Sequence, residues 1–255
     1  MEKSFLIRML NEGRRLDREG VLEFRQPLKV EYGVTSTAEG SAKVTIGNTE
    51  VLAGVKLEIG TPYPDRPDEG TIQVGAELVP LSNPEFESGP PSIQAVELAR
   101  VVDRGIRESK ALDFKSLCIA PREKAWIVVI DIVPLNDDGN LIDASALAVL
   151  AAIIDTRFPV LSEEGVIDYK SKTDKKLKLS CLPIAVTVYK VGNQMLIDPT
   201  REEEKVADAR LTISVMDNGN LCTLQKGGDA PLAMAEVENM IDIASEKTKA
   251  LRNAL

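Results

Sequence analysis

Three arginines in the middle of the chain have the spacing of a single helix face. Arg100, Arg104 and Arg107 stand at positions i, i+4 and i+7 of a segment with helical periodicity, so their guanidinium groups should share a narrow arc. Such an arc could follow the phosphates of a nucleic acid. A solvated face on which Arg100 pairs with Asp103 and Arg104 pairs with Glu108 fits the same spacing and is the commoner arrangement.

A dense group of carboxylates, residues 198–204, follows a predicted strand. It reads Asp-Pro-Thr-Arg-Glu-Glu-Glu and has an acidic side chain at each end. Paired carboxylates can hold Mg²⁺ or act as general acid and base. A solvated acidic loop, with Arg201, Lys205 and Arg210 as counter-charges, is the more common use of such a sequence, and the residues alone favour it.

An acidic turn, residues 136–140, joins a predicted strand to a predicted helix. Amides at a helix N-terminus can hold an anion such as phosphate. Asp137 and Asp138 oppose an anion here, and no Lys, Arg or Thr follows to offset them. The sequence therefore favours a plain Asp-Gly turn over a phosphate site.

The elements expected to position these groups are strands and helices of a mixed α/β protein. Period-two alternation predicts strands at 41–46, 50–59, 71–78, 125–133, 184–191, 194–198, 211–216 and 221–225. Helical periodicity predicts helices at 4–10, 92–112, 143–158 and 231–251. In the second of these, capped by Ser92, the expected buried residues are Val96, Leu98, Val102 and Ile106.

A weak internal repeat indicates two similar halves. Residues 46–52 align with 191–197, each around a Gly-Asn turn, and each hairpin is followed by more strands and a helix. We expect an α/β (α+β type), two-layer unit of two β-hairpin-plus-helix halves, about 20–161 and 181–255. The charged stretch 162–180 between them is expected to be an exposed loop or linker.

Composition excludes several classes of protein. The 31 Lys and Arg against 40 Asp and Glu give a net charge of −9, which disfavours a free-standing nucleic-acid binder. The absence of histidine removes His-dependent catalytic triads and zinc sites. Three distant cysteines and the lack of a long apolar run favour a cytoplasmic protein without disulfides or a membrane span.

Short motifs along nearly the whole chain carry a family resemblance through their order and spacing. The strongest is Glu97–Arg107 with Ser109–Leu112 after it; the others are residues 13–17, 40–42, 47–54, 62–65, 126–131, 138–140 and 198–200. Together they resemble the RNase PH family, and within it the non-catalytic ring subunit of the archaeal exosome. The resemblance implies the RNase PH-like fold, also described as ribosomal protein S5 domain 2-like.

The chain departs from the catalytic members of that family at three places. Where those members carry Gly-Thr-Arg or Gly-Ser-Arg, Gly139 is followed here by Asn-Leu-Ile, and where they carry two aspartates this chain has Asp198 and Glu204. Their Arg-x-Asp-Gly-Arg motif is altered in residues 15–19. The resemblance therefore implies no catalytic residue, no metal and no cofactor, with Asp198 and Glu204 as a degenerate active-site remnant.

The resemblance also implies partners and a role. Arg100, Arg104 and Arg107 would bind single-stranded RNA beside a catalytic RNase PH-like subunit, in an alternating hexameric ring, a trimer of heterodimers, with RNA-binding cap proteins and no membrane contact. The ring would degrade RNA from the 3′ end with phosphate. With 4% aromatic residues, contacts to the RNA backbone without sequence preference are expected.

Two alternatives stay open. The chain could itself be an active phosphate-dependent 3′-to-5′ exoribonuclease, using Asp198 and Glu204 with Mg²⁺. Alternatively, it could be an acidic interaction scaffold with no role in RNA binding.

Overall fold

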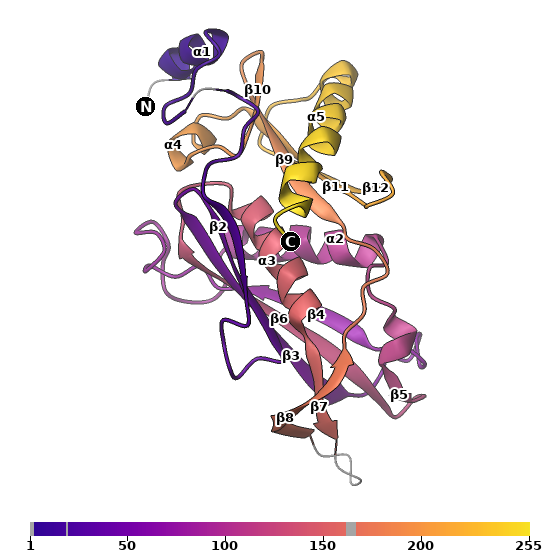
Figure 1. Cartoon of the computed structure of the whole chain (residues 1–255). Helices are drawn as coiled ribbons and strands as arrows, with labels where there is room; N and C mark the ends of the chain where they lie inside the picture. The colour runs from indigo at the N-terminus through magenta and orange to yellow at the C-terminus, as the bar shows by residue number, and fades with distance from the viewer. Residues whose placement is uncertain (1–2, 19, 162–166) are drawn as a thin grey trace.

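The largest of three sheets is built by residues 28–136. The computed structural model describes residues 3–18, 20–161 and 167–255 (Figure 1). The strands of this sheet are β1 (Leu28–Tyr32), β2 (Gly40–Ile46), β3 (Thr49–Gly60), β4 (Thr71–Ala76), β5 (Cys118–Ala120) and β6 (Lys124–Asn136). Their order is β1-β2-β3-β6-β4, with β5 also paired to β6, and only the β4–β6 pair is parallel.

The second sheet is antiparallel and comes from the last third of the chain. It contains β9 (Ile184–Val191), β10 (Gln194–Ile197), β11 (Ala209–Val215) and β12 (Leu221–Gly227) in the order β10-β9-β11-β12. The β2–β3 and β9–β10 hairpins turn at Gly47 and Gly192, whose φ angles of +58° and +61° favour glycine. Both hairpins of the predicted repeat are confirmed.

Helix α3 joins the two sheets into one core. The helices are α1 (Lys3–Asn11), α2 (Ile93–Glu108), α3 (Leu141–Asp155), α4 (Arg201–Glu204) and α5 (Met234–Arg252), with a 3₁₀ turn at Phe114–Leu117. Helix α3 contacts β2 and β3 of the first sheet and β9 of the second, and its Leu147, Leu150 and Ile153 are almost fully buried. Helix α5 covers β9 and β11, whereas α2 packs on β4, α3 and β12 (Figure 1). The prediction of a mixed α/β fold is confirmed. In the described part of the chain, no helix combines the length and apolarity that crossing a membrane requires.

Two helices end earlier than the periodicity predicts. Helix α2 stops at Glu108, where Ser109 caps it, and Lys110 adopts a positive φ of 54°. Helix α3 stops at Asp155, and the hydroxyl of Thr156 donates to the carbonyl of Ala152 at 2.7 Å. Residues expected to close that helix instead begin strand β7 (Arg157–Leu161), because a two-stranded ribbon tolerates its proline.

The charged stretch 162–180 contains a strand, so the expectation of a loop is wrong for part of it. Strand β8 (Ile167–Lys176) pairs antiparallel with β7, and residues 162–166 lie outside the described residues. Cation–π contacts between lysines and aromatic rings stabilise this ribbon. Lys175 lies 4.7 Å from the ring centre of Phe158, and Lys56 lies 4.4 Å from that of Tyr169. A division of the chain into two halves at this stretch stays a prediction.

Candidate functional site

Helix α2 turns an arginine-bearing face away from the core. Leu98, Val102 and Ile106 are buried against the sheet and α3, and the Ser92 side chain accepts a hydrogen bond from the amide of Ala95 at 3.2 Å, as predicted for a cap. Val96 is 54% exposed, so its expected core role is wrong. It lies one turn before Arg100 and therefore shares the outer face.

The three arginines differ in how far they are engaged. Arg107 donates to both oxygens of Asp103, at 3.1 and 2.9 Å, and to the carbonyl of Ile72 on β4 at 3.0 Å. Arg104 forms a looser pair with Glu108 at 3.4 Å, with both side chains more than 40% exposed. Arg100 is exposed and, within the described ranges, has no ionic partner.

These contacts show which of the two predicted salt bridges, Arg100–Asp103 and Arg104–Glu108, form on α2. The Arg104–Glu108 pair is present, but Asp103 pairs with Arg107 rather than Arg100, because an acid four residues before a base is the favoured helical order. Arg107 ties α2 to β4. Arg100 and Arg104 are the two less engaged members of the predicted set, and RNA binding by the three arginines stays a prediction.

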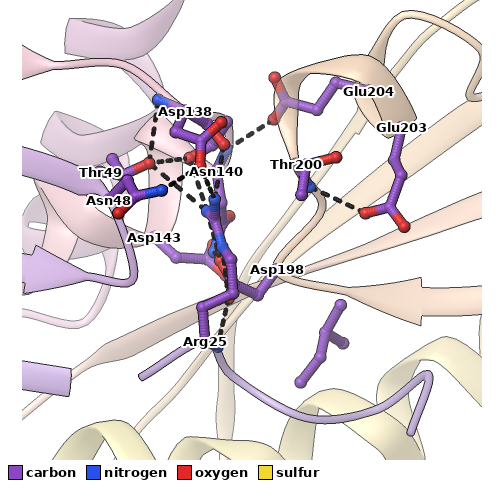
Figure 2. Close-up of polar contacts among 12 residues, drawn as sticks. Arg25, Asn48, Thr49, Asp138, Asn140, Asp143, Asp198, Thr200, Glu203 and Glu204 are labelled. Carbon is purple, nitrogen blue, oxygen red and sulfur yellow. Dashed lines mark hydrogen bonds and ion pairs between the residues drawn. The ribbon is translucent and has the colours of Figure 1, made fainter. Parts of the chain in front are cut away.

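The second cluster centres on Asp198, which is fully buried after strand β10 (Figure 2). Its Oδ2 accepts hydrogen bonds from the backbone amide and Nε of Arg25, at 2.6 and 3.0 Å. Its Oδ1 accepts from Nη2 of Arg25 and from Nδ2 of Asn140, both at 2.9 Å. Both oxygens of Asp198 are therefore engaged by groups of the chain itself.

Glu204 binds the start of α3 from the other side of Asn140 (Figure 2). Its Oε1 accepts hydrogen bonds from the Asn140 amide and the Tyr189 hydroxyl, both at 2.8 Å. Burial raises the pKa of the Glu204 carboxyl, and these two donors only partly offset that effect. The chain thus places its own carboxyl group against the amide at the start of α3, where an anion would otherwise be attracted.

The remaining partners of the acidic segment come from the residues before β1. Arg15 and Glu203 form a fully buried ion pair, and Arg15 also donates to the carbonyls of Ile197 and Asp198, at 2.6 and 3.0 Å. Arg18 donates to the Asp198 carbonyl at 2.6 Å. The expectation of a solvated acidic loop is therefore wrong, since Asp198 and Glu203 are fully buried.

The predicted counter-charges are neighbours in the chain, and one of them pairs as predicted, since Lys205 lies 3.9 Å from Glu202. Arg201 and Lys205 also pair with Glu85, and Arg210 pairs with Glu97, so the buried acids Asp198 and Glu203 take their cations from the residues before β1. Arg25 stands outside every motif that the sequence singled out. The composition of two segments was the one signal in the sequence that they pair with each other: residues 14–25 contain four arginines, and residues 198–204 contain four acidic residues.

These carboxylates do not fit a divalent cation. A bound Mg²⁺ needs free oxygen ligands, and the guanidinium of Arg25 already binds both oxygens of Asp198. Among the described residues, no three or more His, Cys, Asp or Glu side chains are grouped so as to hold a metal. A mechanism that uses Asp198 and Glu204 with Mg²⁺ is not supported by this geometry.

A cavity of about 320 Å³ lies beside Glu204, between α2, α4 and the second sheet. Its apolar wall includes Phe86, Leu98 and Leu141. Of its two arginines, Arg201 is paired with Asp137 and Glu85, and Arg210 is paired with Glu97. The cavity therefore has an apolar wall and three carboxylates, Glu97, Asp137 and Glu204, against two arginines, which is a poor environment for a phosphate.

Matches to family models cover both parts of the chain. Residues 23–159 match domain 1 of the 3′ exoribonuclease family, RNase PH, and residues 181–247 match domain 2.

Curated relatives match over nearly their full length. The chain is 47% identical over 252 residues to exosome complex component Rrp42 of Methanosarcina acetivorans, covering 99% of this chain and 92% of that protein. It is 41% identical to the Pyrococcus furiosus protein of the same name, with coverage of 99% and 92%.

Chains in two solved structures match this chain with similar identity and coverage. A chain of the Archaeoglobus fulgidus exosome, described as having RNA bound to the active site, is 44% identical with a TM-score of 0.90, covering 98% of this chain and 96% of that one. A chain of an archaeal exosome core is 42% identical with a TM-score of 0.86, covering 98% and 94%.

Proposed function

Because this chain belongs to the 3′ exoribonuclease (RNase PH) family, we propose that it is a non-catalytic subunit of an exosome ring. Its full-length similarity to archaeal Rrp42 proteins and to chains of archaeal exosome cores supports membership of such a complex. In this role the chain shapes and supplies RNA contacts to an active site that another subunit owns. We place the complex in the cytoplasm.

One observation carries the non-catalytic assignment: both oxygens of Asp198 are bound by Arg25 and Asn140. A carboxylate in that state has no free lone pair directed at a metal or a substrate proton. Glu204 adds to this by placing its carboxyl group on the Asn140 amide, where it opposes an attacking phosphate at the start of α3.

Arg100 and Arg104 provide the RNA contact in this proposal. Both lie on the outer face of α2, with Arg100 unpaired in the described chain and Arg104 only loosely paired. Guanidinium groups bind phosphate oxygens through strong charge-assisted hydrogen bonds. The partner that these residues face is a catalytic RNase PH-like subunit in an alternating six-membered ring, and cap proteins that bind RNA complete the complex.

The test of the non-catalytic assignment is a phosphorolysis assay of the isolated chain. Single-stranded RNA with a free 3′ end, inorganic phosphate and Mg²⁺ should give no nucleoside diphosphate. Release of diphosphate that is lost in an Asp198→Asn variant whose circular dichroism shows a folded chain would show that the chain is itself the phosphorolytic enzyme.

The test of the RNA contact uses rings assembled with the catalytic partner. Arg100→Glu with Arg104→Glu should leave assembly intact and weaken RNA binding regardless of sequence. Arg157→Glu is the control for one charge reversal and is matched to Arg104→Glu alone, since both arginine side chains are 43% exposed. Intact rings with unchanged RNA affinity would instead favour a scaffold without an RNA role.

A further inference from the structure

A second, smaller cavity lies beside the arginine face of α2. It measures about 90 Å³ and is lined by residues of α2, β11 and β12. Helix α2 packs here against β12, the edge strand of the second sheet (Figure 1). Helix α2 contributes Glu97 and Arg100, strand β11 contributes Arg210 and Thr212, and strand β12 contributes Gln225 and Lys226. The exposed Arg100 is therefore the residue that joins this cavity to the proposed RNA-contacting face.

The register of the sheet directs Arg210 toward α2. Arg210 is paired with Gly227 and Thr212 with Gln225, so these four residues share one face of the β11–β12 ladder. A side chain at Gly227 would collide with the guanidinium, because a Cβ there would lie 2.6 Å from Cζ of Arg210. The absence of a side chain at Gly227 lets the guanidinium lie against the backbone of β12.

The basic side chains that line the cavity outnumber its acidic ones. Glu97 is its one carboxylate, and its Oε1 accepts a hydrogen bond from Nη2 of Arg210 at 2.6 Å. Lys226 donates to the carbonyl of Gly228 at 2.5 Å, and Arg100 has no ionic partner in the described chain. Lys226 is paired with Leu211, so its side chain leaves the opposite face of the ladder from Arg210. Two guanidiniums, those of Arg100 and Arg210, therefore line the cavity against one carboxylate, which is 46% exposed and easily displaced.

We propose that this cavity binds one phosphate of the RNA backbone between Arg100 and Arg210, and that Glu97 occupies Arg210 until the phosphate replaces it. The inference rests on the proposed RNA contact and extends it from α2 onto the second sheet. A phosphodiester has two free oxygens, which suits two guanidiniums on opposite sides. An RNA already held at Arg104 presents its neighbouring phosphate at high effective concentration.

The competing interpretation is that the Glu97–Arg210 pair is purely structural. The two interpretations predict different signs for the change in RNA affinity when Glu97 or Arg210 is replaced. If the pair only holds α2 on β11, removing either partner breaks the same contact and both variants change RNA binding in the same direction. If Arg210 binds phosphate and Glu97 competes for it, the two variants change RNA binding in opposite directions.

The experiment measures the anisotropy of labelled single-stranded poly(A) bound to the assembled ring, at two salt concentrations. Arg210→Gln should weaken binding about fivefold and reduce the slope of log affinity against log salt by about 0.7, as for one lost phosphate contact on a single strand. Glu97→Gln should tighten binding about twofold. The matched controls, Arg157→Gln and Glu246→Gln, change the net charge equally on ion-paired residues of β7 and α5, outside the cavity, and should move affinity less.

Each outcome decides the proposal. Shifts of the same sign in the Arg210 and Glu97 variants, or shifts no larger than in the controls, overturn the phosphate site. Should Arg210→Gln rings not assemble, the Glu97→Gln ring alone decides by whether it binds RNA more tightly than the Glu246→Gln ring. Loss of affinity in the Arg100→Glu, Arg104→Glu ring together with a neutral Arg210 variant would remove this cavity from the RNA path but leave the proposed function standing.

Discussion

Arg25 makes the densest set of polar contacts at the junction of the two parts of the chain. It binds Asp198 after β10 and, through Nη1 and Nη2, the carbonyls of Asp138 and Gly139 before α3, at 2.6 and 3.1 Å. Arg25 and Asp198 are almost wholly buried, so removal of one partner leaves an uncompensated charge.

We therefore expect Arg25→Met to lower the free energy of unfolding by about 3–5 kcal/mol, the usual cost of breaking a buried ion pair. Arg104→Met is the control, since its pair with Glu108 is exposed and its loss should cost less than about 1 kcal/mol. Urea unfolding followed by circular dichroism measures both. Equal losses in the two variants would contradict the assigned role of Arg25.

Asp143 is a buried acid that should make stability depend on pH. Its Oδ1 accepts from the hydroxyl of Thr187 at 2.7 Å and its Oδ2 from the Thr187 amide at 3.1 Å. Burial raises the pKa of Asp143 from 3.8 to about 7, and the nearby Asp198 carboxylate acts in the same direction.

The folded protein therefore holds this proton more tightly than the unfolded chain does. The stability that it contributes is fully present below about pH 4 and is lost as the pH rises through about 7. Relative to an Asp143→Asn variant, which stays neutral, the native chain should lose up to about 4 kcal/mol between about pH 4 and pH 8. Urea unfolding of both proteins across that range is the measurement, and parallel profiles would mean that Asp143 titrates normally.

At the scale of elements, the turn before α3 fits closely against α4. Gly139 has a φ of +92°, and a Cβ there would lie 2.5 Å from the carbonyl oxygen of Pro199 and 2.7 Å from the amide of Arg201. Backbone contact at this point brings Asn140 within reach of both Asp198 and Glu204.

Gly139→Ala should therefore destabilise the protein by more than the cost of placing alanine at a positive φ angle. Gly219 is a matched control, with a φ of +85° and nothing within 4 Å of an added Cβ. Gly219→Ala should cost about 1–2 kcal/mol from the positive φ, whereas Gly139→Ala should cost at least about 2 kcal/mol more because α4 must move. Thermal and urea unfolding compare the two, and similar losses would show that α4 can shift freely.

At the scale of the whole molecule, a net charge of −9 opposes contact with RNA. A few arginines on α2 cannot overcome that field alone, but they can act inside a site completed by another subunit. The isolated chain should therefore bind single-stranded RNA at least about tenfold more weakly than the assembled ring, with a flatter dependence on salt because fewer phosphates are neutralised.

Fluorescence anisotropy of the chain before and after addition of its partner checks this expectation. The partner alone serves as the control. Tight, salt-dependent binding by the free chain would place the whole RNA contact on this protein.

The sequence by itself determined the features that depend on neighbours along the chain. The two hairpins follow from Gly-Asn turns between alternating strands, and the direction of Arg100 and Arg104 follows from helical periodicity. The mixed α/β fold and the family resemblance follow from the order of many such local patterns. Each of these needs no knowledge of distant contacts.

Only the tertiary structure decided what surrounds Asp198 and Glu204. Their partners Arg25 and Asn140 stand far away in the sequence, and a carboxylate-rich segment reads as solvated unless the cations that bury it are known. The β7–β8 ribbon was likewise not predictable from the sequence. A lysine-rich segment is typical of a loop unless the aromatic rings that its side chains cover, such as Phe158 under Lys175, are known. A charged side chain is buried only when an oppositely charged partner is buried with it, and folding brings such partners together here, as in Arg25–Asp198 and Arg15–Glu203.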